Sequence, residues 1–415
     1  MKPAEVIALT RGYPRRLWLV SFAAYGLSQM DLALWSYALP LIRAEFGLTR
    51  TEIGLLTGVA FAVGGLGLVW LGLLADRYGR RTMIMFGTIA SSLFVTAHAV
   101  ATSLVPLAVA RAGSIACGGL LYPATGALVA EEAPPRIRGL MTGLLQIAYP
   151  VGWFLASLLA ALLLQSYGWR VLFLTGLISI PFVFVIRRVV RESARLAPQQ
   201  EHESRASIRE LFVPGMRRRT LTLFFAQYFF VVAYGGAFIF APTYFHEERG
   251  FEIAGTATLV GLSNLIGLVG YLAAAWVGEF YLTRRTTTII WTLLGSLFFM
   301  VFLWLSESYA QSLVAFSVMA IFLLGTAAVK FAYIAELFPT RLRATGIAFS
   351  SSLAGTLGQA SGPALIGWLA DTRGWDFAMF CGGALPLLAA AFLYLFLKPL
   401  PSGLDVDEVQ RRLAQ

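Results

Sequence analysis

The sequence predicts an all-α membrane protein in which twelve transmembrane helices form two pseudo-symmetric six-helix bundles. Of the 415 residues, 58% are hydrophobic and only 13% are charged, which is more apolar surface than a water-facing fold can bury. A helix needs about 20 largely apolar residues to cross a bilayer. Twelve windows of the chain meet that requirement, at 16–41, 52–74, 82–103, 105–129, 139–164, 170–189, 219–242, 255–277, 287–305, 311–334, 345–368 and 376–397.

The twelve spans fall into two groups of six around a polar stretch. Residues 191–216 include Pro198, Gln199 and several charges, so this stretch cannot cross a bilayer and is predicted to be a cytosolic linker. We therefore expect four parts: an N-terminal bundle at 1–189, the linker at 190–218, a C-terminal bundle at 219–397 and a cytosolic tail at 398–415.

The two groups also repeat one another at a spacing of about 205 residues. Glu-Glu-Ala-Pro-Pro-Arg-Ile-Arg at 131–138 aligns with Glu-Leu-Phe-Pro-Thr-Arg-Leu-Arg at 336–343. Gly168-Trp169 before the sixth span is matched by Gly374-Trp375 before the twelfth. The repeat indicates a duplicated six-helix unit. In this architecture the substrate binds at the interface of the two halves.

The net charge of +10 is explained by the predicted membrane topology and does not indicate a nucleic-acid binding site. If the N-terminus is cytosolic, most Lys and Arg residues lie in cytosolic segments, as the positive-inside rule requires. The opposite side holds only Arg43, Arg50, Arg170, Arg249 and Arg373. We expect a multi-pass protein of a bacterial inner membrane with both termini cytosolic, whose basic loops contact lipid headgroups. The polar start of the chain and the long first span argue against a cleavable signal peptide.

The sequence offers no sign of catalysis or of a bound cofactor. Cys117 and Cys381 both fall inside spans, and no His/Cys cluster has the spacing of a metal site. No phosphate-binding glycine loop occurs, which argues against an ATP-driven pump. We expect no enzyme activity, no cofactor, no metal and no nucleic-acid partner.

A polar, basic loop separates the second and third spans. Asp76 lies near the inner end of the second helix and can accept hydrogen bonds from helix N-termini of the other half, where the dipole is positive. The alternative is a solvated positive-inside loop. The stretch resembles the signature loop of the major facilitator superfamily, whose members are secondary transporters. That resemblance implies a cytosolic gate formed here by Gly72, Asp76, Arg77, Gly79, Arg80 and Arg81.

The two repeated Glu-x-x-Pro-x-Arg-x-Arg loops narrow the resemblance. They resemble those of the sugar porters and of the metabolite:proton and aromatic acid:proton symporters. The resemblance implies that Glu131, Arg138, Glu336 and Arg343 belong to a cytosolic charge network that breaks when the transporter opens inward. The alternative is simple solvation of the loops.

Asp31 is an ionisable residue near the middle of the first span, where charge is costly and by default marks a functional path. Ser28 at i−3 and Trp35 at i+4 share its helix face. Burial and a nearby cation act in opposite directions on a carboxyl group, so an acid under both influences can exchange a proton near neutral pH. The alternative is a structural acid permanently paired to a cation.

Arg111 lies in the fourth span, and Tyr122 shares its face three turns further on. Because arginine keeps its proton, Arg111 is either an anion clamp or the counter-charge of Asp31. In the sugar porters and related proton symporters an acid on helix 1 and an arginine on helix 4 form the coupling pair. The resemblance therefore implies that Asp31 and Arg111 couple transport to protons.

Lys330 is the one lysine inside a predicted span, in the tenth, with Tyr333 close by in sequence. A desolvated ammonium facing a cavity would attract a carboxylate substrate. The alternative is that Lys330 snorkels to the inner surface or pairs with Glu336.

Other polar and aromatic residues within spans are candidates to line a cavity. The alternative for the two glutamines, Gln146 and Gln359, is that they form hydrogen bonds between helices. His98 and His246, near the outer ends of their spans, are predicted to be interfacial. The further candidates for substrate contact are Trp35, Tyr122, Gln146, Tyr149, Trp153, Tyr228, Tyr234, Tyr333 and Gln359.

These observations favour a secondary active transporter that carries a small organic anion together with a proton by alternating access. The expected substrate is a monocarboxylate, aromatic and heteroaromatic acids included, and the transporter is expected to work as a monomer. A drug/proton antiporter and a sugar/proton symporter are the alternatives, and a non-transporting membrane receptor is a further one. The helix 5 sequence around Pro150 and Gly152 departs from the antiporter pattern, and few cavity amides are available for a sugar.

Overall fold

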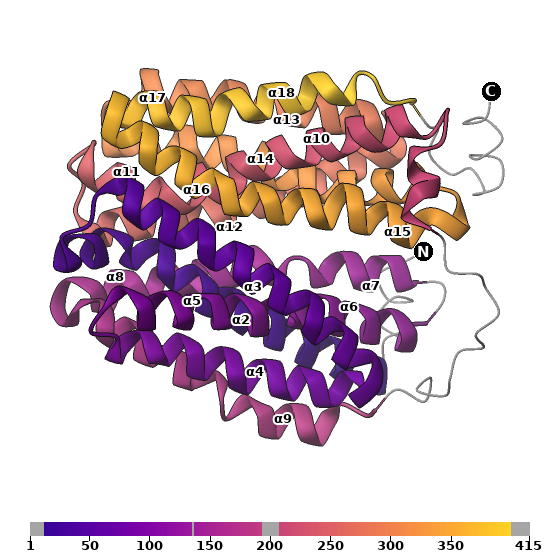
Figure 1. Cartoon of the computed structure of the whole chain (residues 1–415), viewed down its shortest axis with the longest axis horizontal. Coiled ribbons are helices and arrows are strands. Elements are labelled where there is room, and N and C mark those ends of the chain that lie inside the picture. The colour runs from indigo at the N-terminus through magenta and orange to yellow at the C-terminus, as the bar shows by residue number, and fades with distance from the viewer. Residues whose placement is uncertain (1–11, 135–136, 193–206, 400–415) are drawn as a thin grey trace. The chain divides into compact units, whose positions relative to one another are not determined.

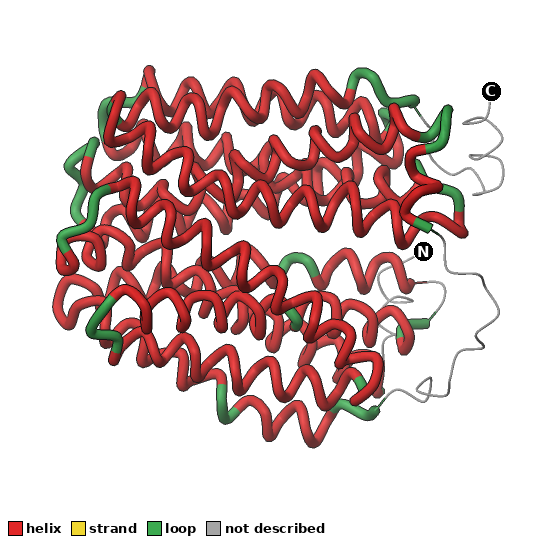
Figure 2. Tube along the Cα trace, in the orientation of Figure 1, coloured by secondary structure: helices red, strands yellow, loops and turns green. Residues whose placement is uncertain are grey.

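The computed structural model describes residues 12–134, 137–192 and 207–399, without the side chains of residues 75, 76, 340 and 344. These residues form helices joined by short loops, and no strand occurs among them (Figures 1 and 2). The chain divides into two compact units. Unit 1 comprises Met1–Phe46, Val59–Glu201 and Glu252–Gly261, and unit 2 comprises Gly47–Gly58, His202–Phe251 and Leu262–Gln415.

The helices follow the predicted spans closely. Unit 1 contains α2 (Tyr13–Phe46), most of α3 (Arg50–Tyr78), α4 (Arg80–Ala97), α5 (Leu104–Gly119), α6 (Leu121–Glu132), α7 (Arg138–Leu145), α8 (Ala148–Leu174) and α9 (Phe182–Val189). Unit 2 contains α10 (Arg217–Ala233), α11 (Ile239–Glu247), most of α12 (Ile253–Phe280), α13 (Arg284–Leu305), α14 (Tyr309–Glu336), α15 (Arg343–Ile347), α16 (Ala354–Arg373), α17 (Trp375–Met379) and α18 (Leu385–Tyr394).

Ten helical runs among the described residues are long and apolar enough to cross a membrane. One of them contains two of the predicted spans, and one further span is too polar to be included, which gives twelve. One of the ten, Arg138–Val189, has 52 residues and contains Gly168 with a φ of 77°. That left-handed backbone breaks the run into the predicted fifth and sixth spans. The remaining span is α16, whose Gln359, Ser361 and Asp371 lower its hydropathy. The prediction of an all-α protein with twelve membrane helices is confirmed.

Glycines let the helices within each unit approach closely. A Cβ at Gly152 on α8 would lie 2.4 Å from the Gly26 carbonyl oxygen on α2, so only glycine permits this α2–α8 contact in unit 1. In unit 2 a Cβ at Gly362 on α16 would lie 2.7 Å from the Val232 carbonyl oxygen on α10. Close backbone approach through small residues is the usual way in which membrane helices pack.

The predicted repeat reappears as matched contacts inside the two units. In unit 1 the Trp169 indole donates a hydrogen bond to Glu45 at the end of α2, with 2.7 Å between Nε1 and Oε2. In unit 2 the Trp375 indole donates to Glu247 at the end of α11 over 3.2 Å. Both tryptophans follow a glycine with positive φ, Gly168 and Gly374. The duplicated sequence landmarks therefore make equivalent structural contacts.

Candidate functional site

Asp31 is buried in the middle of α2, with 1% of its surface exposed. Its Oδ2 atom accepts a hydrogen bond from the Ser179 hydroxyl over 3.3 Å, and its buried Oδ1 atom has no protein partner. Ser28, one turn earlier, donates to the Gly118 carbonyl oxygen on α5 over 2.9 Å. Among the described residues, the one hydrogen bond to this carboxyl group comes from a neutral hydroxyl.

Arg111 on α5 is also buried and lies against α2. Its Nη1 atom donates to the carbonyl oxygen of Leu32 over 3.1 Å. Its guanidinium lies 5.1 Å from the ring centroid of Trp35 and 5.5 Å from that of Phe61 on α3, distances typical of cation–π contacts. Arg111 and Asp31 form no ion pair in the described structure, and the arginine instead bonds the backbone one residue beyond the acid. Their predicted coupling role stays a prediction.

His98 joins this cluster, although the sequence pattern did not suggest it. It begins the short 3-10 segment His98–Val100 at the end of α4, and its side chain is buried inside unit 1. Its ring stacks on Phe173 at 4.5 Å and lies 5.6 Å from the Trp35 ring. Only the spatial neighbourhood of Trp35 and Arg111 identifies His98, because its position near a span end resembles that of many interfacial histidines.

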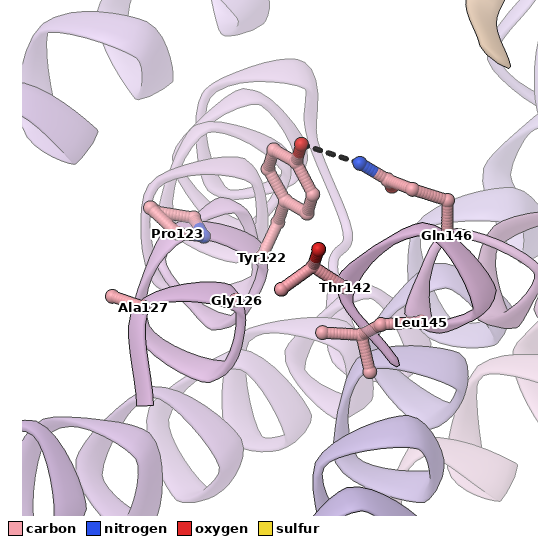
Figure 3. A pocket seen from close by; sticks show the side chains of 7 residues that line it. All are labelled: Tyr122, Pro123, Gly126, Ala127, Thr142, Leu145 and Gln146. Carbon is pink, nitrogen blue, oxygen red and sulfur yellow. Dashed lines mark hydrogen bonds between the residues drawn. The ribbon is translucent and has the colours of Figure 1, made fainter. Parts of the chain in front are cut away.

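A small cavity in unit 1 brings together two of the predicted substrate residues. Gln146, between α7 and α8, donates from its Nε2 atom to the Tyr122 hydroxyl on α6 over 2.5 Å (Figure 3). The cavity has a volume of about 270 Å³, just below the roughly 300–1,000 Å³ typical of ligand pockets. It is lined by Tyr122, Pro123, Gly126, Ala127, Thr142, Leu145 and Gln146. Its phenol, amide and hydroxyl groups suit a small polar ligand.

Tyr149 and Trp153, the other predicted aromatics of this region, lie on α8 with ring centroids 6.0 Å apart. Trp153 is buried against α2, where its carbonyl oxygen accepts a hydrogen bond from the Tyr37 hydroxyl over 3.5 Å. Trp153 therefore packs the α2–α8 contact, whereas Tyr149 is half-buried.

Lys330 on α14 is buried in unit 2, with 2% of its surface exposed. Its Nζ atom lies 3.3 Å from the ring centroid of Phe230 on α10 and 5.3 Å from that of Phe331. Glu336, which the sequence offered as a partner, instead bonds Arg284. Among the described residues no carboxylate forms an ion pair with Lys330, and its Nζ atom lies against the Phe230 and Phe331 rings.

The remaining predicted residues of unit 2 lie in two places. Tyr228 meets α16, where its hydroxyl lies 3.0 Å from the Ser361 hydroxyl, and Gln359 packs against Gly235. The Tyr234 ring stacks on that of Phe238, with 5.3 Å between the ring centroids. Tyr333 is instead buried among apolar residues, and its hydroxyl donates to the Lys398 carbonyl oxygen over 2.8 Å.

Three of the predicted gate residues, Arg80, Glu131 and Glu336, take part in matched ion pairs, one in each unit, and Arg284 completes the second pair. Arg80 at the start of α4 bonds Glu131 at the end of α6 over 2.6 Å. Arg284 at the start of α13 bonds Glu336 at the end of α14. The duplicated loops thus use the same contact in both units.

The basic loop makes further contacts in unit 1. Gly79 has a φ of 89°, and a Cβ there would lie 2.6 Å from the Glu192 carboxylate, which also accepts the Arg81 backbone N–H over 3.1 Å. Arg77 is exposed and Gly72 half-buried. The Asp76 side chain lies outside the described residues. Arg138 begins α7, and Arg343 begins α15 with a buried Nε atom that has no protein partner.

Comparison with known proteins identifies the family. The model of the Major Facilitator Superfamily matches residues 21–286 and 274–413. The chain is 30% identical over 393 residues to the cis,cis-muconate transport protein of Acinetobacter baylyi (strain ATCC 33305 / BD413 / ADP1), covering 92% of this chain and 94% of that protein. It is 25% identical to the niacin transporter NiaP of the same strain, over 95% of each chain. It is also 25% identical to that strain's 4-hydroxybenzoate transporter PcaK, over 94% and 93%.

Solved structures show the same fold at lower identity. The D-xylose-proton symporter superposes with a TM-score of 0.74 at 20% identity, covering 94% of this chain and 99% of that one. A bacterial homologue of the human lysosomal transporter Spinster superposes with a TM-score of 0.72 at 16% identity, over 97% of each chain. The family match spans nearly the whole chain, and we conclude that this protein belongs to the Major Facilitator Superfamily.

Proposed function

We propose that the protein is a secondary active transporter that carries a small organic anion together with a proton by alternating access. The proposed substrate is a monocarboxylate, and aromatic or heteroaromatic acids are included. Relatives named for muconate, niacin and 4-hydroxybenzoate, all organic acids, support an organic anion as substrate, and the latter two carry a single carboxylate on an aromatic ring.

The observation that carries the anion assignment is Lys330. Burying an ammonium in an apolar environment costs free energy unless a partner compensates. Aromatic faces compensate in part, since Phe230 lies 3.3 Å away. A carboxylate substrate would supply the missing charge, whereas a cationic drug would be repelled. This supports an anion carrier over a drug antiporter.

The proton assignment rests on Asp31. The acid is buried inside unit 1, yet Arg111 bonds the neighbouring Leu32 carbonyl oxygen rather than the carboxyl group. A buried carboxyl group without a direct cation partner can bind a proton when the surroundings change. Asp31 is therefore the proposed proton site and Arg111 its proposed counter-charge.

The proposal also covers the cytosolic gate, the membrane location and the oligomeric state of the protein. We infer that Arg80–Glu131 and Arg284–Glu336 break and re-form on the cytosolic side as the transporter turns over. The protein is placed in a bacterial inner membrane with both termini cytosolic, in accordance with the positive-inside rule. It is proposed to work as a monomer.

Uptake into proteoliposomes tests the proposal. With an inward proton gradient, a panel of small carboxylates should include at least one that accumulates, and a protonophore should abolish that accumulation. Asp31→Asn should retain substrate exchange but lose dependence on the proton gradient. Unchanged pH dependence in Asp31→Asn would remove Asp31 from the coupling site. Expulsion of lipophilic cations, or accumulation of a sugar, without uptake of any carboxylate would refute the anion assignment.

A further inference from the structure

His98 presents a buried hydrogen-bond acceptor inside unit 1 that has no partner among the described residues. Its Nδ1 atom lies 2.9 Å from the Phe94 carbonyl oxygen and 3.0 Å from that of Val95. Carbonyl oxygens only accept hydrogen bonds, so Nδ1 carries the ring proton of the neutral imidazole. The Nε2 atom consequently carries a lone pair, and it is buried without a protein partner.

Arg111 presents the complementary group. Its Nε–H is a buried donor without a protein partner, while Nη1 bonds the Leu32 carbonyl oxygen. Arg111 and His98 both contact the Trp35 ring, with separations of 5.1 Å and 5.6 Å to its centroid. One buried donor and one buried acceptor, each without a hydrogen-bond partner among the described residues, therefore belong to two side chains that contact the same indole.

The hydrogen bond from Arg111 to the Leu32 carbonyl oxygen holds the guanidinium close to Asp31. Leu32 follows Asp31 on α2, so the guanidinium is held beside the acid through the backbone. An ionised Asp31 attracts the guanidinium, and a protonated Asp31 does so much less. Protonation of Asp31 therefore weakens the electrostatic attraction that keeps the Arg111 guanidinium close to the Leu32 carbonyl oxygen.

We propose that His98 is a positioning residue of the proton-coupling site, whose Nε2 atom accepts a hydrogen bond from Arg111 once Asp31 is protonated. Arg111 then has two alternative partners, the Leu32 carbonyl oxygen and His98. The change of partner removes one α2–α5 hydrogen bond and leaves that from Ser28 to the Gly118 carbonyl oxygen, so protonation weakens the contact between the two helices. This inference rests on the proposed function, in which Asp31 is the proton site.

The other charged groups near His98 do not offer the same exchange. Elements α4, α5 and α8 pack against its segment, and α2 supplies Trp35. Arg170 on α8 is engaged by Glu45 and by the Ala101 carbonyl oxygen. Arg80 and Arg81 lie at the opposite end of α4. Arg111 and Asp31 are the charged groups that can respond to one another beside the imidazole.

Two substitutions of His98 separate this role from simple packing. His98→Asn keeps an N–H near the Nδ1 position, where it can still bond the Phe94 and Val95 carbonyl oxygens, but it leaves nothing at the Nε2 position. His98→Gln reaches the Nε2 position with an amide oxygen and loses the Nδ1 donor. We expect His98→Asn to keep substrate exchange and to lower proton-driven accumulation about tenfold or more. We expect His98→Gln to restore part of that accumulation.

A merely structural histidine predicts the reverse order, with His98→Asn close to wild type and His98→Gln impaired. That order, or an unchanged pH profile of uptake in His98→Asn, would overturn the proposal. If the wild type accumulates a carboxylate with protons and His98→Asn does so equally, the proposed function stands and only this inference fails.

A measurement that leaves His98 itself unchanged tests the proposal even if the His98 variants do not fold. The chain has three histidines, so ring-¹⁵N labelling with NMR detection identifies the His98 signals once His202→Gln and His246→Gln have assigned the other two. The His98 Nε2 signal should move from a free to a hydrogen-bonded value between high and low pH, and this movement should vanish in Asp31→Asn. A His98 signal that is indifferent to pH in wild type would refute the proposal.

Discussion

Replacing Lys330 by methionine should raise stability and weaken substrate binding at the same time. The ammonium is 2% exposed and has no carboxylate partner in the described structure. Desolvating such a charge costs several kcal/mol, and the Phe230 ring at 3.3 Å returns about 2 kcal/mol. Because methionine fills a similar volume without that penalty, we expect the free energy of unfolding to increase by about 1–3 kcal/mol.

The effect on binding has the opposite sign. A charge-assisted hydrogen bond to a carboxylate contributes about 1.5–3 kcal/mol, so its loss should weaken substrate affinity about 10- to 150-fold. Thermal unfolding in detergent without substrate measures the first effect, and substrate-induced stabilisation measures the second. Lys398→Met is the matched control, because Lys398 is exposed and engages Tyr333 through its carbonyl oxygen. It should change neither quantity.

A single result separates the two roles of Lys330. If it is a structural cation, Lys330→Met should lower the unfolding temperature, because the aromatic contacts with Phe230 and Phe331 are lost. Lower stability together with unchanged affinity for every bound acid would refute the reasoning that a substrate carboxylate completes this site.

Three further outcomes follow from the contacts within the units. Gly152→Val should lower the free energy of unfolding by about 1–3 kcal/mol through overpacking, because even a Cβ at residue 152 would lie 2.4 Å from the Gly26 carbonyl oxygen. Gly143→Ala, where a Cβ meets nothing within 4 Å, is its control, and equal unfolding temperatures would contradict the argument. In a double-mutant cycle, Arg80→Gln and Glu131→Gln should show a coupling of about 0.5–1 kcal/mol, as expected for the half-buried pair; zero coupling would show that the pair is only a surface contact. The Ser207 backbone N–H and then Arg341 hold the pKa of Glu210 below its ordinary value, so these contacts persist at neutral pH and are lost as the pH falls through that lowered pKa. Hydrogen exchange over residues 207–216 should therefore accelerate in acid relative to neighbouring segments, and Glu210→Gln should show the fast exchange already at neutral pH.

The candidate site was predictable in part, because some of its features are local. Asp31, Arg111 and Lys330 could be singled out since a charge inside an apolar run is visible without any knowledge of its neighbours. The contact partners of these residues could not be predicted from the sequence. Asp31 bonds Ser179, 148 residues away, and Lys330 contacts Phe230 on a different helix. Glu336 was offered as a partner of Lys330 by proximity in sequence, yet it bonds Arg284, because the repeat sets its position relative to α13.

By itself the sequence determined the twelve spans, the two halves and the repeat, since hydropathy and loop charge act over one helix at a time. The matched Trp169–Glu45 and Trp375–Glu247 contacts bear out that repeat in three dimensions. Only the tertiary structure decided that Arg111 binds the α2 backbone instead of Asp31, that His98 is buried against Trp35, and that Tyr122 meets Gln146. Those contacts depend on which helix faces are turned toward one another, and that is settled by packing between helices far apart in the chain.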